Sequence, residues 1–228
     1  MRRLIAMLAL LPALAFAQDA APLLMVMDVP DPYLLVWYKL DGNAGDSSIN
    51  KRPGTWGGTE GYTNGVYGQA AVFLATNIIT RATDFGITDQ LTLTAWVKAT
   101  TSGATYPRIV GAEGKWILYI VLSKLRFAGS GLDQAFPDSP DIRDDAWHHV
   151  ACVYDGDGID GYVDGVGVGT IAKTGSLTAQ SGIDLTIGNR ADLTRGLAGL
   201  VDDVRLFNRT LSSNDIVRIK NNLTPLHD

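Results

Sequence analysis

The segment LTLTAWVKA, residues 91–99, alternates between two kinds of side chain along its length. Leu91, Leu93, Ala95 and Val97 fall on one side of an extended chain, and the residues between them fall on the other. A period of two in strand-favouring residues indicates a β-strand with one face in a core. Because such a face must be covered by a second layer, this pattern constrains the architecture of the whole chain.

Similar apolar segments recur along the chain, and Gly, Asp, Asn and Pro separate them at intervals of roughly ten residues, as in β-sandwiches. The further segments that we expect to form strands are 33–40, 70–74, 108–112, 116–122, 149–154, 161–165, 184–189 and 200–207. Residues 211–222 have a helical pattern, because Ser212 or Ser213 can cap a helix in which Ile216 and Ile219 lie three residues apart. The sequence predicts one all-β domain, a two-sheet antiparallel β-sandwich with a short C-terminal helix.

The first residues have the pattern of a secretory signal peptide. Two arginines precede an apolar run that ends in Ala15-Phe16-Ala17, a small-x-small cleavage pattern, and the run is too short to span a membrane. We therefore expect a signal peptide over 1–17, an extension over 18–32, a domain over 33–222 and a tail over 223–228, in a secreted, extracellular or periplasmic protein. Cleavage leaves 17 basic and 24 acidic residues. This balance argues against nucleic-acid binding and against membrane insertion of the mature protein.

The stretch DDAWHHVACVYDGDGIDGYVDG, residues 144–165, combines two histidines with several aspartates. Neighbouring strand residues point to opposite faces, so His148 and His149 cannot readily share a metal ion. The third histidine, His227, lies at the C-terminus, which leaves no cluster of the kind zinc requires. The aspartates occupy positions where hairpin turns need residues that tolerate positive φ, and we interpret the stretch as architecture.

The same stretch carries a family resemblance. The pattern WHHVAxVYDG…YVDG, preceded by WYKLDGNAGDSS and LTLTAWVKA and followed by LTIGNR and GLAGLVDDVRLFNRTLSSNDI, resembles the laminin-G-like, concanavalin-A-like lectin/glucanase domains over residues 33–222. The chain is similar to bacterial-type secreted members of this family. The resemblance implies a jelly roll of two packed antiparallel sheets, and binding or adhesion in place of catalysis.

The resemblance also implies a structural calcium ion that joins the first loop to the last strand. The matching positions are Asp41 and Asp46 in the first loop and Asp202 or Asp203 in the last strand. Carboxylate oxygens suit calcium, and 22 of the 24 acidic residues are aspartates concentrated in turns. The alternative is that the first two aspartates build turns and the last two face solvent.

Aromatic side chains in loops are the candidates for contact with a ligand such as a glycan. Trp56, Tyr62, Tyr67 and Tyr106 occur in Gly/Thr-rich segments that we expect to be loops, and Trp56 is the strongest candidate for a stacking platform. Tryptophans on expected strands are assigned to packing.

Three functions fit a domain of this kind, and we expect the first. It is a non-catalytic module that binds a glycan or a surface protein. The second is a structural component that self-assembles on an extracellular surface, in a filament or on a virion. The third is a glycoside hydrolase, which we expect least, because the two glutamates, Glu60 and Glu113, are far apart in sequence and neighbouring aspartates on one strand diverge.

Overall fold

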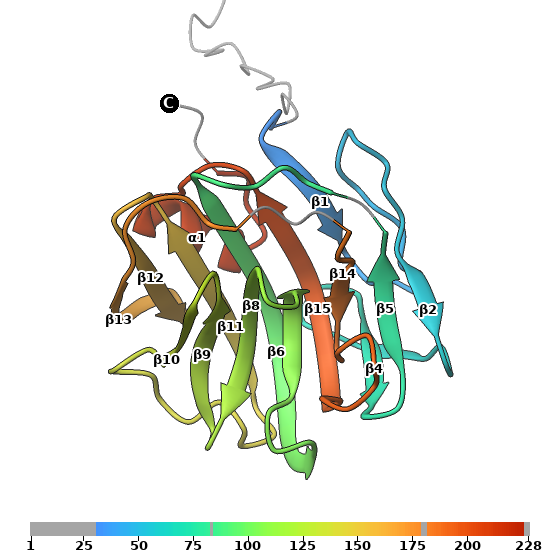
Figure 1. Ribbon diagram of the computed structural model, residues 1–228. Coiled ribbons are helices and arrows are strands. Elements are labelled where there is room, and N and C mark those ends of the chain that lie inside the picture. Colours follow the sequence, from blue (N-terminus) through green and yellow to red (C-terminus); the bar gives the residue numbers. More distant parts are fainter. Residues whose placement is uncertain (1–30, 83, 179–181, 226–228) are drawn as a thin grey trace, which may run out of the picture.

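The computed structural model describes residues 31–82, 84–178 and 182–225. This part of the chain forms two antiparallel sheets packed face to face, with one helix outside them (Figure 1). The expected β-sandwich of jelly-roll type is confirmed. The predicted signal peptide, most of the predicted extension and residues 226–228 lie outside the described residues, so their assignments stay predictions.

Sheet A has the strand order β13-β12-β11-β6-β15-β4-β3, and β1 pairs with β15. Its strands are β1 (Leu34–Tyr38), β3 (Tyr62–Asn64), β4 (Gln69–Leu74), β6 (Leu91–Gly103), β11 (Trp147–Tyr154), β12 (Gly158–Val163), β13 (Val166–Ala172) and β15 (Leu197–Phe207). The two longest, β6 and β15, lie side by side at its centre and run through the middle of the molecule (Figure 1).

Sheet B has the order β10-β9-β8-β7-β14-β5-β2 and lies in front of sheet A in Figure 1. Its strands are β2 (Thr55–Gly57), β5 (Ile78–Arg81), β7 (Arg108–Ala112), β8 (Trp116–Val121), β9 (Lys124–Gly129), β10 (Leu132–Ala135) and β14 (Leu185–Ile187). The core lies between the sheets, where Leu93 and Val97 of sheet A and Leu118 and Phe127 of sheet B belong to one buried cluster.

The single helix of the described chain, α1 (Ser213–Lys220), covers part of the outer face of sheet A. Ser212 caps it through a reciprocal pair of hydrogen bonds with Asp215. Ile216 and Ile219 pack with Phe207 in a second apolar cluster, which gives sheet A a partly buried outer face. Within the described residues, no helix has the length and apolar content needed to cross a membrane.

Every segment expected to be a strand contains one, but two details differ. The expected strand 161–165 includes a turn, because Asp164 adopts a left-handed φ of 55° and β12 ends at Val163. In β15 the register with β6 shifts between Asp202 and Arg205, and Asp203 has a φ of 48°. This bulge breaks the alternation of the strand, so Asp202 and Asp203 do not diverge as the sequence predicted.

Candidate functional site

A row of charged and aromatic side chains crosses the outer face of sheet B. Arg126, Tyr119 and Arg108 face one another on the neighbouring strands β9, β8 and β7. Residues opposite each other in antiparallel strands share a face, so the three side chains lie together on the outer face, where Tyr119 and Arg108 are buried by their neighbours. We call this row, together with the three charged residues Glu113, Asp133 and Arg190 around it, the sheet B band. Its six residues are Arg108, Glu113, Tyr119, Arg126, Asp133 and Arg190.

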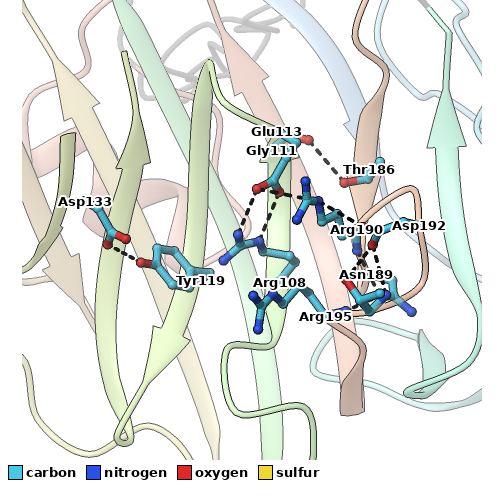
Figure 2. Close-up of polar contacts among 11 residues, drawn as sticks. Arg108, Gly111, Glu113, Tyr119, Asp133, Thr186, Asn189, Arg190, Asp192 and Arg195 are labelled. Atoms are coloured by element: carbon cyan, nitrogen blue, oxygen red, sulfur yellow. Dashed lines mark hydrogen bonds and ion pairs between the residues drawn. The ribbon is translucent and has the colours of Figure 1, made fainter. Parts of the chain in front are cut away.

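Arg108 and Glu113 form the centre of the sheet B band (Figure 2). The Nε and Nη2 atoms of Arg108 donate to the two carboxylate oxygens of Glu113 at 3.1 and 2.9 Å, a bidentate pair. The Arg108 guanidinium also lies 4.4 Å from the centre of the Tyr119 ring. Because the ring and the carboxylate hold it from two sides, this guanidinium has a fixed position on the sheet.

The second charged pair of the band stands on β9 and β10. Arg126 Nη2 lies 2.9 Å from Asp133 Oδ1, and the Tyr119 hydroxyl donates to the same carboxylate. Burial by itself raises the pKa of Asp133, but the hydrogen bonds from Tyr119 and Arg126 outweigh it and bring the pKa below its ordinary value. Burial, followed by the hydrogen bond to Asp133, raises the pKa of Tyr119 to about 12. Asp133 is therefore an anion, and Tyr119 is a neutral hydroxyl.

The loop after β14 carries the remaining arginines of this face. Asn189 is buried, and its Oδ1 accepts the backbone N–H groups of Arg190 and Arg195 at 2.9 and 3.1 Å, which fixes the loop. Arg190 Nε lies 3.8 Å from Glu113, on the other side of the carboxylate from Arg108 (Figure 2). The Arg195 guanidinium lies 5.0 Å from the centre of the Tyr106 ring. Tyr106 is a predicted ligand contact, and its side chain lies beside the band with 40% of its surface exposed.

Three of the four predicted calcium ligands meet at another place, a pocket of about 330 Å³ beside β1 and β15. This β1–β15 pocket is lined by Trp37, Lys39, Asp41, Tyr67, Asp202 and Asp203, together with Gly68 and Asn222. The bulge in β15 brings both of its aspartates to the same pocket. The β3–β4 loop closes over them, because Asp202 Oδ2 accepts the N–H groups of Val66 and Tyr67 at 2.8 and 3.0 Å.

Asp46 is not a lining residue of that pocket. Its carboxylate accepts the N–H groups of Trp37 and Ser48 on Oδ1 at 2.9 and 2.8 Å. Oδ2 accepts the Arg52 N–H at 2.7 Å and the Ser48 hydroxyl at 2.8 Å. With four donors around it, this carboxylate holds the loop between β1 and β2 in place and has no lone pair aimed at an ion.

The four aspartates do not fit calcium as they are arranged. Calcium takes six to eight oxygen ligands. Asp203 is already paired with Arg205, whose Nη2 lies 3.0 Å from its Oδ2, and Asp41 Oδ1 accepts the Gln69 N–H at 2.7 Å. Among residues 31–225, apart from 83 and 179–181, no group of three His, Cys, Asp or Glu side chains is placed to hold a metal ion. A bound calcium ion stays a prediction from the family resemblance.

The other predicted ligand contacts, Trp56, Tyr62 and Tyr67, are partly buried and held by contacts within the protein, although Tyr67 also lines the β1–β15 pocket. Trp56 lies in β2 and stacks on Phe73 with ring centres 5.4 Å apart, while its Nε1 donates to the Tyr62 hydroxyl at 2.7 Å. Both rings pack against the core, so the face of Trp56 that contacts Phe73 cannot stack on a sugar. The Tyr67 hydroxyl donates to the Lys220 carbonyl and ties the β3–β4 loop to α1.

The histidine pair divides between the faces, as the sequence predicted. His148 Nδ1 lies 2.8 Å from Asp164 and its Nε2 lies 3.2 Å from Asp144. His149 is fully buried beneath the outer surface of sheet A, with its ring 5.3 Å from that of Trp96. Their separation rules out a shared metal ion.

Comparison with known families shows to which family the chain belongs. Residues 68–217 match the family described as the concanavalin A-like lectin/glucanases superfamily, in its laminin G group. The match covers more than half of the chain, and the chain belongs to this family. No curated protein sequence matches it.

Solved structures share the fold. Domain 4 of AbnA, a GH43 extracellular arabinanase from Geobacillus stearothermophilus solved with arabinotriose, is 22% identical with a TM-score of 0.70, and the match covers 82% of this chain and 98% of that domain. The binding domain of Paraclostridial Mosquitocidal Protein 1 is 11% identical with a TM-score of 0.68, over 83% of this chain and 52% of that one. A structure of botulinum neurotoxin type C, a toxin whose cell entry depends on interaction with two ganglioside molecules, is 14% identical with a TM-score of 0.64. The match covers 84% of this chain and 51% of that one. The chain spans about half of each toxin structure.

Proposed function

We propose that this protein is a secreted, non-catalytic glycan-binding domain and that the sheet B band holds the glycan. The observation that carries the proposal is the fixed set of planar charged groups on the outer face of sheet B. Arg108 is clamped between Glu113 and Tyr119, and Arg126 is joined to Asp133.

The chemistry of the band suits a ligand rich in hydroxyl groups. A sugar hydroxyl both donates and accepts, and the band offers guanidinium donors next to carboxylate acceptors. Their mutual pairing restrains the side chains before a ligand arrives, which lowers the entropic cost of binding. The arabinanase domain with the same fold was solved with arabinotriose, which supports a glycan as the ligand class. The lectin-like family supports it as well.

The charges of the band oppose glycoside hydrolysis. That reaction needs a carboxylic acid whose pKa is raised so that it can protonate the leaving oxygen. The hydrogen bonds that Asp133 accepts outweigh its burial and lower its pKa, and the Glu113 carboxylate is bound by Arg108 and lies near Arg190. The lowered pKa of Asp133 is the opposite of what the acid requires, and we expect the bound glycan to remain intact.

Secretion belongs to the same proposal and is supported by the arginine-led apolar run of residues 1–17. An extracellular domain meets glycans of a cell surface or a cell wall. Self-assembly on such a surface remains the alternative.

A glycan array followed by calorimetry tests the proposal. Wild-type protein should bind a defined set of glycans without releasing reducing ends. Arg190→Ala removes an exposed guanidinium from the band and leaves Arg108–Glu113 in place, and we expect it to weaken the best glycan about tenfold. This is the effect of losing one charge-assisted hydrogen bond of about 1.4 kcal/mol.

The matched control is Arg218→Ala, which removes an arginine from α1 on the opposite sheet and should bind as wild type does. Equal affinities of wild type and Arg190→Ala for the best glycan would contradict the placement on sheet B. An empty array, with folded protein verified by circular dichroism, would contradict glycan binding itself.

A further inference from the structure

The β1–β15 pocket contains a buried carboxylate oxygen whose hydrogen-bonding capacity is unused. Asp202 is fully buried, and its Oδ2 accepts two backbone N–H groups of the β3–β4 loop. Its Oδ1 has no hydrogen-bond partner among the described residues, although the side chain lines the pocket. A buried acceptor without a donor is costly, and native proteins supply one from protein, water or ligand.

The neighbouring cations are already engaged. Arg205 is buried, lies 3.0 Å from Asp203 Oδ2 and also donates to Asn222 Oδ1 at 3.0 Å. Its guanidinium lies over one face of Trp37, whose Nε1 donates to Asp203 Oδ1. Lys39 Nζ lies over the Trp37 ring, 4.5 Å from its centre.

The pocket therefore carries an excess negative charge. Asp41, Asp202 and Asp203 bring three carboxylates, against which Lys39 and Arg205 bring two cations. Burial raises the pKa of Asp202 to about 6, so its carboxylate is ionised at neutral pH and is protonated in mild acid. His149, also on this face of sheet A, is buried and adds no charge, since burial lowers its pKa to about 3. The Nζ of Lys220, on the nearby helix, donates to the Asp164 carbonyl. That carbonyl is neutral and leaves the charge of Lys220 in place, so the excess of one carboxylate holds only for the groups that line the pocket together with Arg205.

We propose that the β1–β15 pocket binds the protonated primary amine of a small ligand, with Asp202 Oδ1 as its main acceptor. An ammonium group carries a single positive charge and three N–H donors. The buried, unpartnered oxygen of Asp202 takes one donor, the rim carboxylate of Asp41 takes another, and Tyr67 adds an aromatic wall that suits a cation.

An ammonium group fits better than a divalent ion for a geometric reason. A calcium ion needs several free oxygens converging on one point, whereas one oxygen each of Asp41, Asp202 and Asp203 accepts a donor of the protein. The other oxygen of Asp203 has no hydrogen bond but is ion-paired with Arg205 at 3.0 Å. An ammonium needs one to three acceptors at hydrogen-bond distance. The lining groups and Arg205 carry one more carboxylate than cation, which favours a monocation.

The amine can belong to a sugar or to a peptide, and calorimetry with small probes distinguishes the sources. The probes are glucosamine, its uncharged counterpart N-acetylglucosamine, and a lysine whose α-amine and carboxyl are blocked. Saturable binding of glucosamine but not of N-acetylglucosamine supports an amino sugar. Binding of the blocked lysine alone supports a peptide amine, and binding of both amines shows that the ammonium group suffices.

Variants locate the site. Asp202→Asn keeps an oxygen for the Val66 and Tyr67 amides but removes the charge, so we expect amine affinity to fall about tenfold or more. Asp157→Asn, in the exposed β11–β12 turn, is the matched control and should bind as wild type does. Asp41→Asn, on the exposed rim, should also weaken binding and serves if Asp202→Asn does not fold.

Three results would overturn the proposal. They are equal binding of glucosamine and N-acetylglucosamine, failure of both amines to bind at millimolar concentration, and unchanged affinity in both pocket variants. The outcome is separate from that of the sheet B band, which lies on the opposite face of the sandwich. Arg190→Ala should leave amine binding intact.

Discussion

His149 lies in β11 with its ring buried against Trp96, and neither ring nitrogen has a hydrogen-bond partner among the described residues. Burial, reinforced by the positive charge of Arg205, lowers its pKa to about 3. The unfolded chain takes up a proton near pH 6.5, whereas the folded chain does not. The stability associated with neutral His149 is therefore present above pH 6.5 and is lost as the pH falls toward 3.

Replacing His149 by leucine should remove this pH dependence. Between pH 7 and pH 5, wild type should lose about 2 kcal/mol more unfolding free energy than His149→Leu does. The substitution leaves no other group without a hydrogen-bond partner, because neither ring nitrogen of His149 has a partner among the described residues. Urea unfolding of both proteins at the two pH values measures the difference. Parallel pH profiles of the two proteins would show that the histidine is protonated in the fold.

At the scale of elements, the loop between β1 and β2 depends on Asp46. Removing its carboxylate in Asp46→Ala leaves three backbone N–H donors without an acceptor, so we expect a loss of about 3 kcal/mol in unfolding free energy. Because these donors and the Ser48 hydroxyl hold the carboxylate, the loss should be the same with and without a calcium chelator. Thermal melts of wild type and variant, each with and without chelator, make the measurement.

The same experiment tests the calcium predicted from the family resemblance. A wild-type melting temperature that falls with chelator and recovers with calcium would support the ion. If that response also vanished in Asp46→Ala, the hydrogen-bonded role of Asp46 would be contradicted. Asp157→Asn, at an exposed turn, controls for loss of a carboxylate.

Sequence alternation identified β6 as a strand, but the prediction that only one of its faces is buried was wrong. Thr92, Thr94 and Trp96 on the other face are buried as well, which the sequence pattern could not indicate. Short edge strands such as β2 and β10 were missed, since three or four residues carry too little pattern. The bulge at Asp203 could not be predicted from the sequence for another reason. Whether an aspartate within a strand adopts a left-handed conformation depends on how that strand pairs with its neighbours. Four aspartates and four aromatics were named, and the expectation that these aromatics lie in loops was wrong for Trp56 in β2 and Tyr62 in β3. The sheet B band was not named, because Arg108 and Tyr119 meet through strand pairing.

On the scale of the whole molecule, the open edges of both sheets decide whether copies can join. Sheet B ends in two short strands, and sheet A ends in β3, of three residues, in β13, of seven, and in β1, of five, whose Tyr38 forms a bridge with Asp46. The edge of β13 is partly used, since the Asp138 N–H donates to the Val168 carbonyl and Pro137 packs over Gly169. Short or covered edges are how β-proteins avoid edge-to-edge pairing.

We therefore expect the mature protein to be a monomer, which favours ligand binding over self-assembly. Size-exclusion chromatography with light scattering should give the mass of one chain, and a tenfold dilution should leave that mass unchanged. A stable ring or polymer would support the alternative of a self-assembling surface, filament or virion component. In that case the same measurement on Arg190→Ala would show whether the sheet B band joins the copies, because a contact through the band should weaken when its exposed arginine is lost.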